Sequence, residues 1–283
     1  MAISLSLVPN RQTAELLFAC FAFICSVFAP LAGADSQQPR MVIIIDDMGD
    51  NLAQGIAAIN LPGPIAYAIL PHTPKSKVLA EMANSQGKDV MVHVPMDNTH
   101  RLALGPGGLT DALSKDVFIK TLRDGLKAVP YAVGFNNHMG SLLTQKEAQM
   151  QWAMQVAKKQ QMFFIDSLTT SDTVAWKAAR RADIPWLIRD IFLDHEQTPE
   201  FVERQFNAGV ALARERGFAV LIGHPYPVTI NFLQEALPRL GELGIQLVAP
   251  SGFLLQMQDS QDLERARQHF CEAEECRAQG YHQ

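Results

Sequence analysis

Residues 41–47 read Met-Val-Ile-Ile-Ile-Asp-Asp, so that five consecutive apolar residues are followed at once by two carboxylates. A continuous, largely β-branched run of this kind is typical of a strand buried on both faces of a parallel sheet. Two adjacent carboxylates after such a strand are costly unless a cationic group lies beside them. The alternative is that one carboxylate caps the following helix and the other is solvated. The segment therefore predicts a parallel α/β fold, with Asp46 and Asp47 as candidates for a polar site.

The rest of the chain repeats this strand-then-helix alternation. Seven further short apolar runs predict strands, at residues 64–70, 89–93, 132–135, 162–165, 186–188, 218–222 and 246–249. Helical spacing is found between them, at residues 51–59, 76–85, 114–127, 145–160, 173–182, 198–216 and 230–240. Roughly eight strands in one domain of this length predict an α/β barrel or a large open sheet.

Composition and charge limit the class of protein. The chain has 283 residues, of which 48% are apolar and 19% charged, as in ordinary globular proteins. Its net charge is −5, so we do not expect nucleic acid or anionic lipid to be the main partner.

The first 34 residues have the organisation of a secretory signal peptide. Arg11 precedes a mostly apolar run at residues 14–31, which ends in Ala32-Gly33-Ala34. An uncleaved membrane anchor is the alternative, because the run is about long enough to span a bilayer. The signal interpretation predicts a periplasmic or secreted protein with no stable membrane span, a domain at residues 35–258 and a polar tail at 259–283.

Two cysteines remain after such a cleavage. Cys271 and Cys276 are five positions apart, and in an oxidising compartment they could close a small disulfide loop. Two reduced thiols on a C-terminal helix are an equal alternative.

Polar side chains follow one predicted strand after another, and this favours the barrel. In a parallel α/β barrel the carboxyl ends of the strands meet at one face, whereas an open sheet spreads them along an edge. The residues in these positions are Asp46, Asp47, His93, Asn136, Asn137, His138, Asp166, Arg189, Asp190 and His224. Carboxylates and histidines together suit a divalent metal site with acid and base groups, and zinc prefers these ligands.

Several of these residues also have ordinary structural interpretations. His93 could be a neutral core histidine, and His138 and His224 could be surface side chains. Arg189 could clamp a carboxylate or form a structural ion pair. Asp97 lies four residues after His93, but Pro95 disfavours a helix that would place both on one side. His72, His100 and His195 lie further from strand ends and are expected at the surface.

Common catalytic motifs are missing from the sequence. It contains no GxxxxGK[ST] loop, no GxSxG elbow, no HExxH and no GxGxxG after a strand. The glycine-rich segment at residues 105–108 contains Pro106 and is predicted to be a turn. Kinase, serine hydrolase, zincin protease and dinucleotide-binding functions therefore lack their best signals.

Six segments together resemble the divergent polysaccharide deacetylase family, a branch of the NodB-like carbohydrate esterases. They are residues 43–49 (IIIDDMG), 92–97 (VHVPMD), 134–141 (GFNNHMGS), 164–167 (FIDS), 189–194 (RDIFLD) and 223–225 (GHP). The resemblance covers about residues 40–255. It implies a distorted (β/α) barrel of about seven strands and a metal-dependent removal of N-acetyl groups from a sugar polymer, for example peptidoglycan or another envelope polysaccharide.

The resemblance also suggests a role for individual residues. Asp46 looks like the general base and His224 like the general acid that protonates the leaving amine. Asp47, His93 and His138 would hold the metal, expected to be zinc, because Asp97 stands where the family's second histidine is usual. The remaining candidates are expected to support the site: Asp97, Asn137, Asp166, Arg189 and Asp190, with Arg189 holding Asp46.

Three functions fit these expectations. The leading hypothesis is a metal-dependent deacetylase acting on an envelope glycan. A catalytically inactive glycan-binding or envelope-assembly protein that kept the barrel is the first alternative, since the usual ligand set is changed. A metal-dependent hydrolase of another amide or ester is the second.

Overall fold

The computed structural model describes residues 38–259. The expected signal peptide at residues 1–34, the Cys271–Cys276 pair and the polar tail beyond Asp259 lie outside the described residues. Within the described part, none of the helices combines the length and the apolar character needed to cross a membrane.

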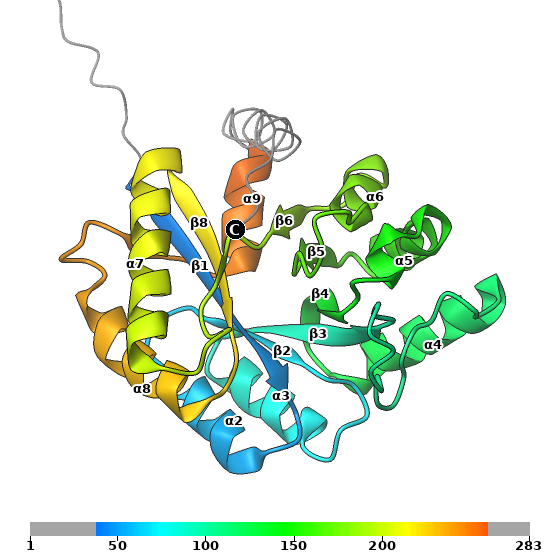
Figure 1. Cartoon of the computed structure of the whole chain (residues 1–283), viewed down its shortest axis with the longest axis horizontal. Coiled ribbons are helices and arrows are strands. Elements are labelled where there is room, and N and C mark those ends of the chain that lie inside the picture. Colours follow the sequence, from blue (N-terminus) through cyan, green and yellow to red (C-terminus); the bar gives the residue numbers. More distant parts are fainter. Residues whose placement is uncertain (1–37, 260–283) are drawn as a thin grey trace, which may run out of the picture. The chain divides into compact units, whose positions relative to one another are not determined.

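The centre of the fold is a curled sheet of parallel strands (Figure 1). The strands are β1 (Arg40–Met48), β2 (Ala66–Ile69), β3 (Asp89–Met96), β4 (Ala132–Met139), β5 (Phe163–Asp166), β6 (Trp186–Ile188), β7 (Ile191–Phe192), β8 (Phe218–Gly223) and β9 (Gln246–Leu247). They are ordered β6-β5-β4-β3-β2-β1-β8-β7, and β9 pairs with β1. Because neighbouring strands are parallel, their carboxyl ends share one face, as the α/β alternation predicted.

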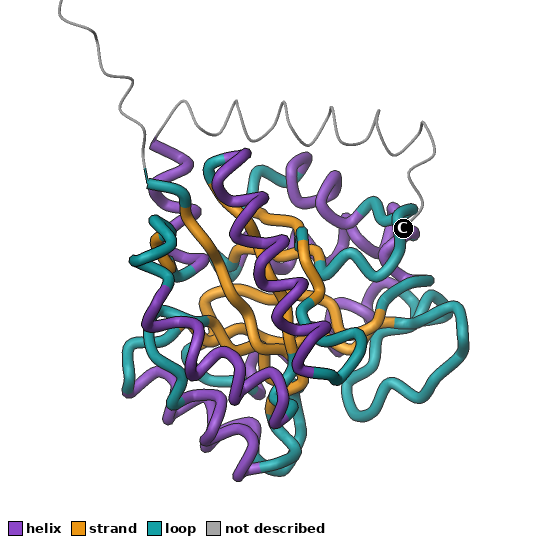
Figure 2. The backbone as a smooth tube through the Cα atoms, turned by 60° about the vertical axis from the view of Figure 1, so that its left-hand side comes forward, coloured by secondary structure: helices purple, strands orange, loops and turns teal. Residues whose placement is uncertain are grey.

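Helices cover the outside of this sheet (Figure 2). They are α2 (Leu52–Ile59), α3 (Ser76–Ser85), α4 (Lys115–Ala128), α5 (Glu147–Lys159), α6 (Ala175–Arg181), α7 (Pro199–Arg216) and α8 (Pro227–Ala236). The helix α9 (Pro250–Asp259) differs, because its Phe253, Leu254 and Met257 pack with the inward-facing residues of the strands. The strand ends opposite the polar face are thus covered by α9, a helix that the sequence analysis did not predict.

The two edges of the curled sheet approach each other at β6 and β7. The backbone N–H of Arg189 donates to the Asp166 carbonyl on β5, and that of Asp190 donates to the Val220 carbonyl on β8. The two-residue link between β6 and β7 therefore bonds to both sides of the opening. This is the distorted barrel that the family resemblance implied.

Alternate residues of each strand enter two different cores. In β1, Val42 and Ile44 join the core inside the barrel, whereas Ile43 and Ile45 join the core under the outer helices. A strand places successive side chains on opposite faces, so this parity applies to the polar residues at the strand ends as well. It decides which of them can reach the interior.

Three strands extend three or more residues past their expected carboxyl ends. β1 continues past Ile45 to Met48. β3 continues past His93 to Met96, and β4 continues past Phe135 to Met139. We had expected β1 and β4 to end before their first polar residues and β3 to end at His93. Here these side chains bond to one another, so the ladder continues through them.

Candidate metal centre

A β-bulge directs both carboxylates of β1 towards the same site. In a regular strand Asp46 and Asp47 would face opposite sides of the sheet. The pairing of β1 with β2 shifts register between Ile45 and Met48, and Asp47 has a φ of 54°. A left-handed aspartate is uncommon, and bulges of this kind re-aim side chains beside functional sites. Asp47 consequently lies over the end of the barrel together with Asp46.

The strands β3 and β4 supply the nitrogen ligands. His93 on β3 pairs in register with Asn136 on β4, and Pro95 pairs with His138. Phe135 lies in the core under the helices. Asn136 and His138 therefore both lie on the opposite face of β4, which points into the barrel. His93, Asn136 and His138 therefore converge on Asp46 and Asp47.

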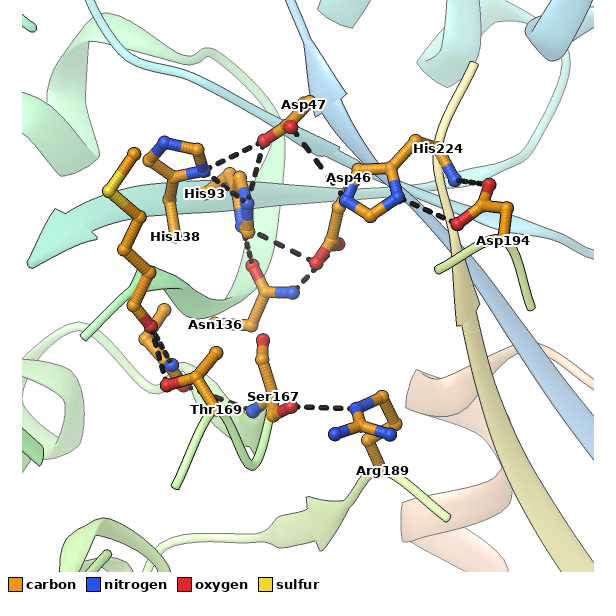
Figure 3. A network of polar contacts seen from close by, with 12 residues as sticks. Asp46, Asp47, His93, Asn136, His138, Ser167, Thr169, Arg189, Asp194 and His224 are labelled. Atoms are coloured by element: carbon orange, nitrogen blue, oxygen red, sulfur yellow. Dashed lines mark hydrogen bonds and ion pairs between the residues drawn. The ribbon is translucent and has the colours of Figure 1, made fainter. Parts of the chain in front are cut away.

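Three ligand atoms meet at one point of this cluster (Figure 3). The Oδ1 atom of Asp47 lies 2.8 Å from His138 Nδ1 and 3.1 Å from His93 Nε2. The two histidine nitrogens are 3.2 Å apart. All three side chains offer an atom within 4.8 Å of the others. One oxygen and two imidazole nitrogens converging in this way could hold a divalent metal ion, with a coordination position left open.

The state of Asp47 Oδ1 supports this interpretation. The atom is buried and has no hydrogen-bond donor with suitable geometry among the described residues, although ring nitrogens of His93 and His138 lie beside it. Buried carboxylate oxygens are normally hydrogen-bonded, so each such exception requires an explanation. A cation bound between Asp47, His93 and His138 would satisfy the oxygen, and these residues therefore fit a divalent metal.

The electrostatics separate the two aspartates. Burial raises the pKa of Asp46, and His93, His224 and Asn136 offset this only in part. Burial would also raise the pKa of Asp47, but its contacts with His138 and His93 hold it well below the ordinary range. For His93, burial favours a lower pKa, but Asp46 and Asp47 outweigh it and raise the pKa to about 9. The site thus favours a positive charge, either a proton on His93 or a metal ion, between two carboxylates of different character.

His224 faces the cluster from β8 and is oriented by Asp194. Its Nδ1 is 2.9 Å from Asp194 Oδ1, while its Nε2 is 3.7 Å from Asp47 Oδ2. Burial would lower the pKa of His224, but the hydrogen bond and charge of Asp194, with the two site aspartates, raise it. Asp194 also accepts from the His224 backbone N–H and from Thr229 Oγ1. His224 is therefore held with Nε2 towards the site.

Asp194 and Asn136 were not assigned a role from the sequence. Asp194 lies two residues after the short strand β7, which pairs with β8 and so brings Asp194 beside His224. Because β7 was not predicted, the position of Asp194 beside His224 was not predicted either. Asn137, not Asn136, was named as a supporting residue. Asn136 lies two positions before His138, so both are on the same face of a strand, and this spacing could have identified it.

Asp166 and Asn137 were expected to support the site but face away from it. On β5, Ile165 enters the interior core, so Asp166 points to the helix layer, where it accepts from Leu168 N, Thr173 Oγ1 and Trp176 N. Asn137 binds the Met139 carbonyl and the Ser167 N–H. Strand parity makes both of them structural.

Arg189 does not hold Asp46, contrary to our expectation. It donates to the backbone carbonyls of Ser167 and Leu168 and stacks on Phe192. The hydrogen-bond donor to Asp46 is instead Asn136.

Asp190 and Asp97 also take structural positions. Asp190 accepts from Val220 N and lies 3.0 Å from Arg216 Nη1, at the closure of the barrel. Asp97 accepts from Asn98 N in its own loop and is not part of the Asp47, His93 and His138 cluster.

A cavity of about 230 Å³ opens beside His138. Its walls include Pro71, Pro95 and the loop residues Leu104 and Pro106, with Asp50 among the polar lining groups. The glycine-rich turn at residues 105–108, expected from the sequence, therefore forms part of a pocket next to the candidate metal centre.

Comparison with known proteins decides the family. The model of the divergent polysaccharide deacetylase family matches residues 43–254. The chain belongs to the divergent polysaccharide deacetylase family. This confirms the resemblance found in the sequence, and the matched range contains Asp46, Asp47, His93, His138 and His224.

Relatives of this family member include uncharacterized proteins. The chain is 34% identical over 239 residues to the uncharacterized protein YibQ of Escherichia coli K12, covering 84% of this chain and 73% of YibQ. It is 37% identical over 211 residues to an uncharacterized protein of Haemophilus influenzae, covering 75% of each. The crystal structure of the uncharacterized protein ATU2773 of Agrobacterium tumefaciens has the same fold, with a TM-score of 0.74 at 19% identity, covering 79% of this chain and 92% of that one.

Replacing His138 tests the ligand set. We expect the unaltered protein to bind about one zinc ion per chain, as one three-ligand site requires. His138→Ala removes one of the three ligands and should lose the zinc after dialysis, measured by elemental analysis. The exposed His100 provides the control, and His100→Ala should keep its zinc. Equal zinc content in all three proteins would refute the assignment of His138.

Proposed function

We propose that the protein is a metal-dependent hydrolase that removes N-acetyl groups from a cell-envelope polysaccharide, with peptidoglycan as the first candidate. The observation that carries the proposal is the Asp47, His93 and His138 cluster with two further groups beside it, Asp46 at 3.7 Å from His93 and His224 at 3.7 Å from Asp47. Hydrolysis of an amide requires a base on one side of the reacting carbonyl and an acid for the leaving amine. Family membership supports the substrate class.

Asp47, His93 and His138 would hold the metal, for which we propose zinc. A divalent ion at this position supplies a Lewis acid that acidifies water and polarises a carbonyl group. The histidines donate through Nε2 of His93 and Nδ1 of His138, the two atoms that face Asp47. Asp47 and His138 are partly exposed, so a substrate could approach the cluster from their side.

Asp46 is the proposed general base. Its side chain is buried, it lies 3.7 Å from His93, and burial raises its pKa towards the range in which a carboxylate can take up a proton near neutral pH. The bound amide of Asn136 occupies Oδ1, so Oδ2 is the oxygen that would receive the proton of an attacking water.

His224 is the proposed general acid. Asp194 accepts at Nδ1, and this leaves Nε2 to carry the proton that a departing amine requires. The raised pKa keeps this proton on the ring at a higher pH than for an ordinary histidine. The aromatic rings of Phe192 and Tyr226 pack against its ring, with centroid distances of 5.1 and 5.4 Å.

The cavity beside His138 is the proposed binding site for a part of the substrate next to the acetamide. Its proline and leucine walls suit the apolar face of a sugar ring, and Asp50 can accept hydrogen bonds from hydroxyl groups. We further propose that the protein acts in the periplasm or outside the cell, where the expected signal peptide would deliver it.

Asp46→Asn separates catalysis from metal binding. The amide keeps the shape of the side chain but cannot act as a base, so we expect acetate release from peptidoglycan to fall by about 10²–10⁴-fold. Zinc content should not change. Asp183, whose side chain is 94% exposed, provides the control variant Asp183→Asn. Full activity of Asp46→Asn would disprove its role as base, and glycan binding without acetate release by the zinc-loaded unaltered protein would favour a binding protein.

Leu104→Trp tests the cavity. The indole ring would fill space beside His138, so KM for the glycan should rise by about tenfold or more while zinc content stays the same. Leu102 lies in the same loop and is exposed, and it is not among the residues that line the cavity. Leu102→Trp is therefore the control. An unchanged KM in Leu104→Trp would exclude the cavity as a substrate site.

A further inference from the structure

Asn136 joins the proposed base to a proposed metal ligand. The side chain is fully buried on β4, its Nδ2 donates to Asp46 Oδ1 at 2.8 Å, and its Oδ1 lies 2.7 Å from His93 Nδ1. We propose that Asn136 is a positioning residue whose single amide group orients Asp46 and also sets which ring nitrogen of His93 is offered to the metal. The inference rests on the proposed function and adds a residue to which the sequence assigned no role.

The orientation of the amide follows from its neighbours. The carboxylate of Asp46 only accepts hydrogen bonds, so the NH₂ end of Asn136 must face it. The opposite orientation would place the amide oxygen against a carboxylate oxygen. The carbonyl end of Asn136 therefore faces His93 Nδ1.

This orientation determines the tautomer of a metal-binding His93. A carbonyl oxygen accepts only, so Nδ1 must carry the hydrogen, and in the neutral ring Nε2 then carries the lone pair. Nε2 is the atom that lies 3.1 Å from Asp47 Oδ1 and 3.2 Å from His138 Nδ1. Asn136 thus directs the lone pair of His93 to the point where the other two ligand atoms meet. Partners of this kind raise metal affinity by holding the ligand ring.

The same amide limits the orientation of Asp46. Its Oδ1 is taken by the amide hydrogen, while Oδ2 lies 3.7 Å from His93 Nδ1. Rotation of the carboxylate would break the 2.8 Å bond between two buried side chains, and an unpaired buried amide is costly. The base and the ligand are therefore held by one side chain rather than by two independent contacts.

Two substitutions of Asn136 separate these roles. Asn136→Ala removes both contacts, and zinc affinity should fall by about 10–100-fold, as is typical for lost partners of metal ligands. Asn136→Asp keeps an acceptor oxygen for His93 Nδ1 but places a second carboxyl group, in place of the NH₂ donor, against Asp46. It should therefore retain most of the zinc affinity while kcat for acetate release from peptidoglycan falls. Asn137→Asp makes the same change one residue along on the opposite face of β4, and it should leave zinc affinity unchanged.

The measurements are zinc affinity, by competition with a chromophoric chelator, and the protonation of His93 in the zinc-loaded full chain, by nitrogen NMR. The proposal predicts a hydrogen on Nδ1 of His93 and none on Nε2. An Asn136→Ala variant with unchanged zinc affinity, or a His93 protonated on Nε2, would overturn it. If the zinc-loaded unaltered protein releases no acetate, the proposed function fails by itself, and these two measurements still decide the role of Asn136. A protein that binds no divalent ion at all would overturn both.

Discussion

Two adjacent carboxylates at the end of β1, Asp46 buried and Asp47 partly exposed, are the constraint around which this protein is organised. Charge on the buried Asp46, with a second carboxylate beside it, requires positive charge and hydrogen-bond donors supplied by other strands. The β3 and β4 strands supply His93, Asn136 and His138, and β8 supplies His224. The polar cluster therefore links strands that are distant in the sequence. It takes the place of apolar packing inside the barrel at the carboxyl ends of the strands.

The alternation of strand faces determines which polar residues enter the cluster. Asn136 and Asn137 are neighbours of the same type, yet one bonds to Asp46 and the other ties β4 to the loop after β5. The exception to the alternation is Asp47, where the β-bulge and the positive φ turn a second carboxylate towards the interior. A regular strand would have placed Asp47 on the helix-facing side, and the three-ligand cluster would lack its oxygen.

Much of this could be predicted from the sequence, and the omissions have a common physical origin. The apolar runs and helical spacing predicted the parallel barrel, and the family resemblance gathered Asp47, His93 and His138. The errors at Asp166, Asn137 and Asp190 arose because a position after a strand was taken to mean a side chain in the site. Orientation depends on strand parity, and the parity of Asn137 could not be assigned while β4 was expected to end at Phe135. The position of Asp194 could not be predicted because it depends on β7. This strand has two residues, and its formation is decided by its pairing with β8.

We propose that one carboxylate and two histidines from three different strands form a metal centre. X-ray absorption spectroscopy at the zinc edge of the zinc-loaded full chain would identify the atoms around the metal. We expect a first shell of oxygen and nitrogen atoms with the outer-shell scattering of two imidazole rings. A sulfur shell at about 2.3 Å, which would place the metal on cysteine side chains, or a shell without imidazole, would contradict this metal centre.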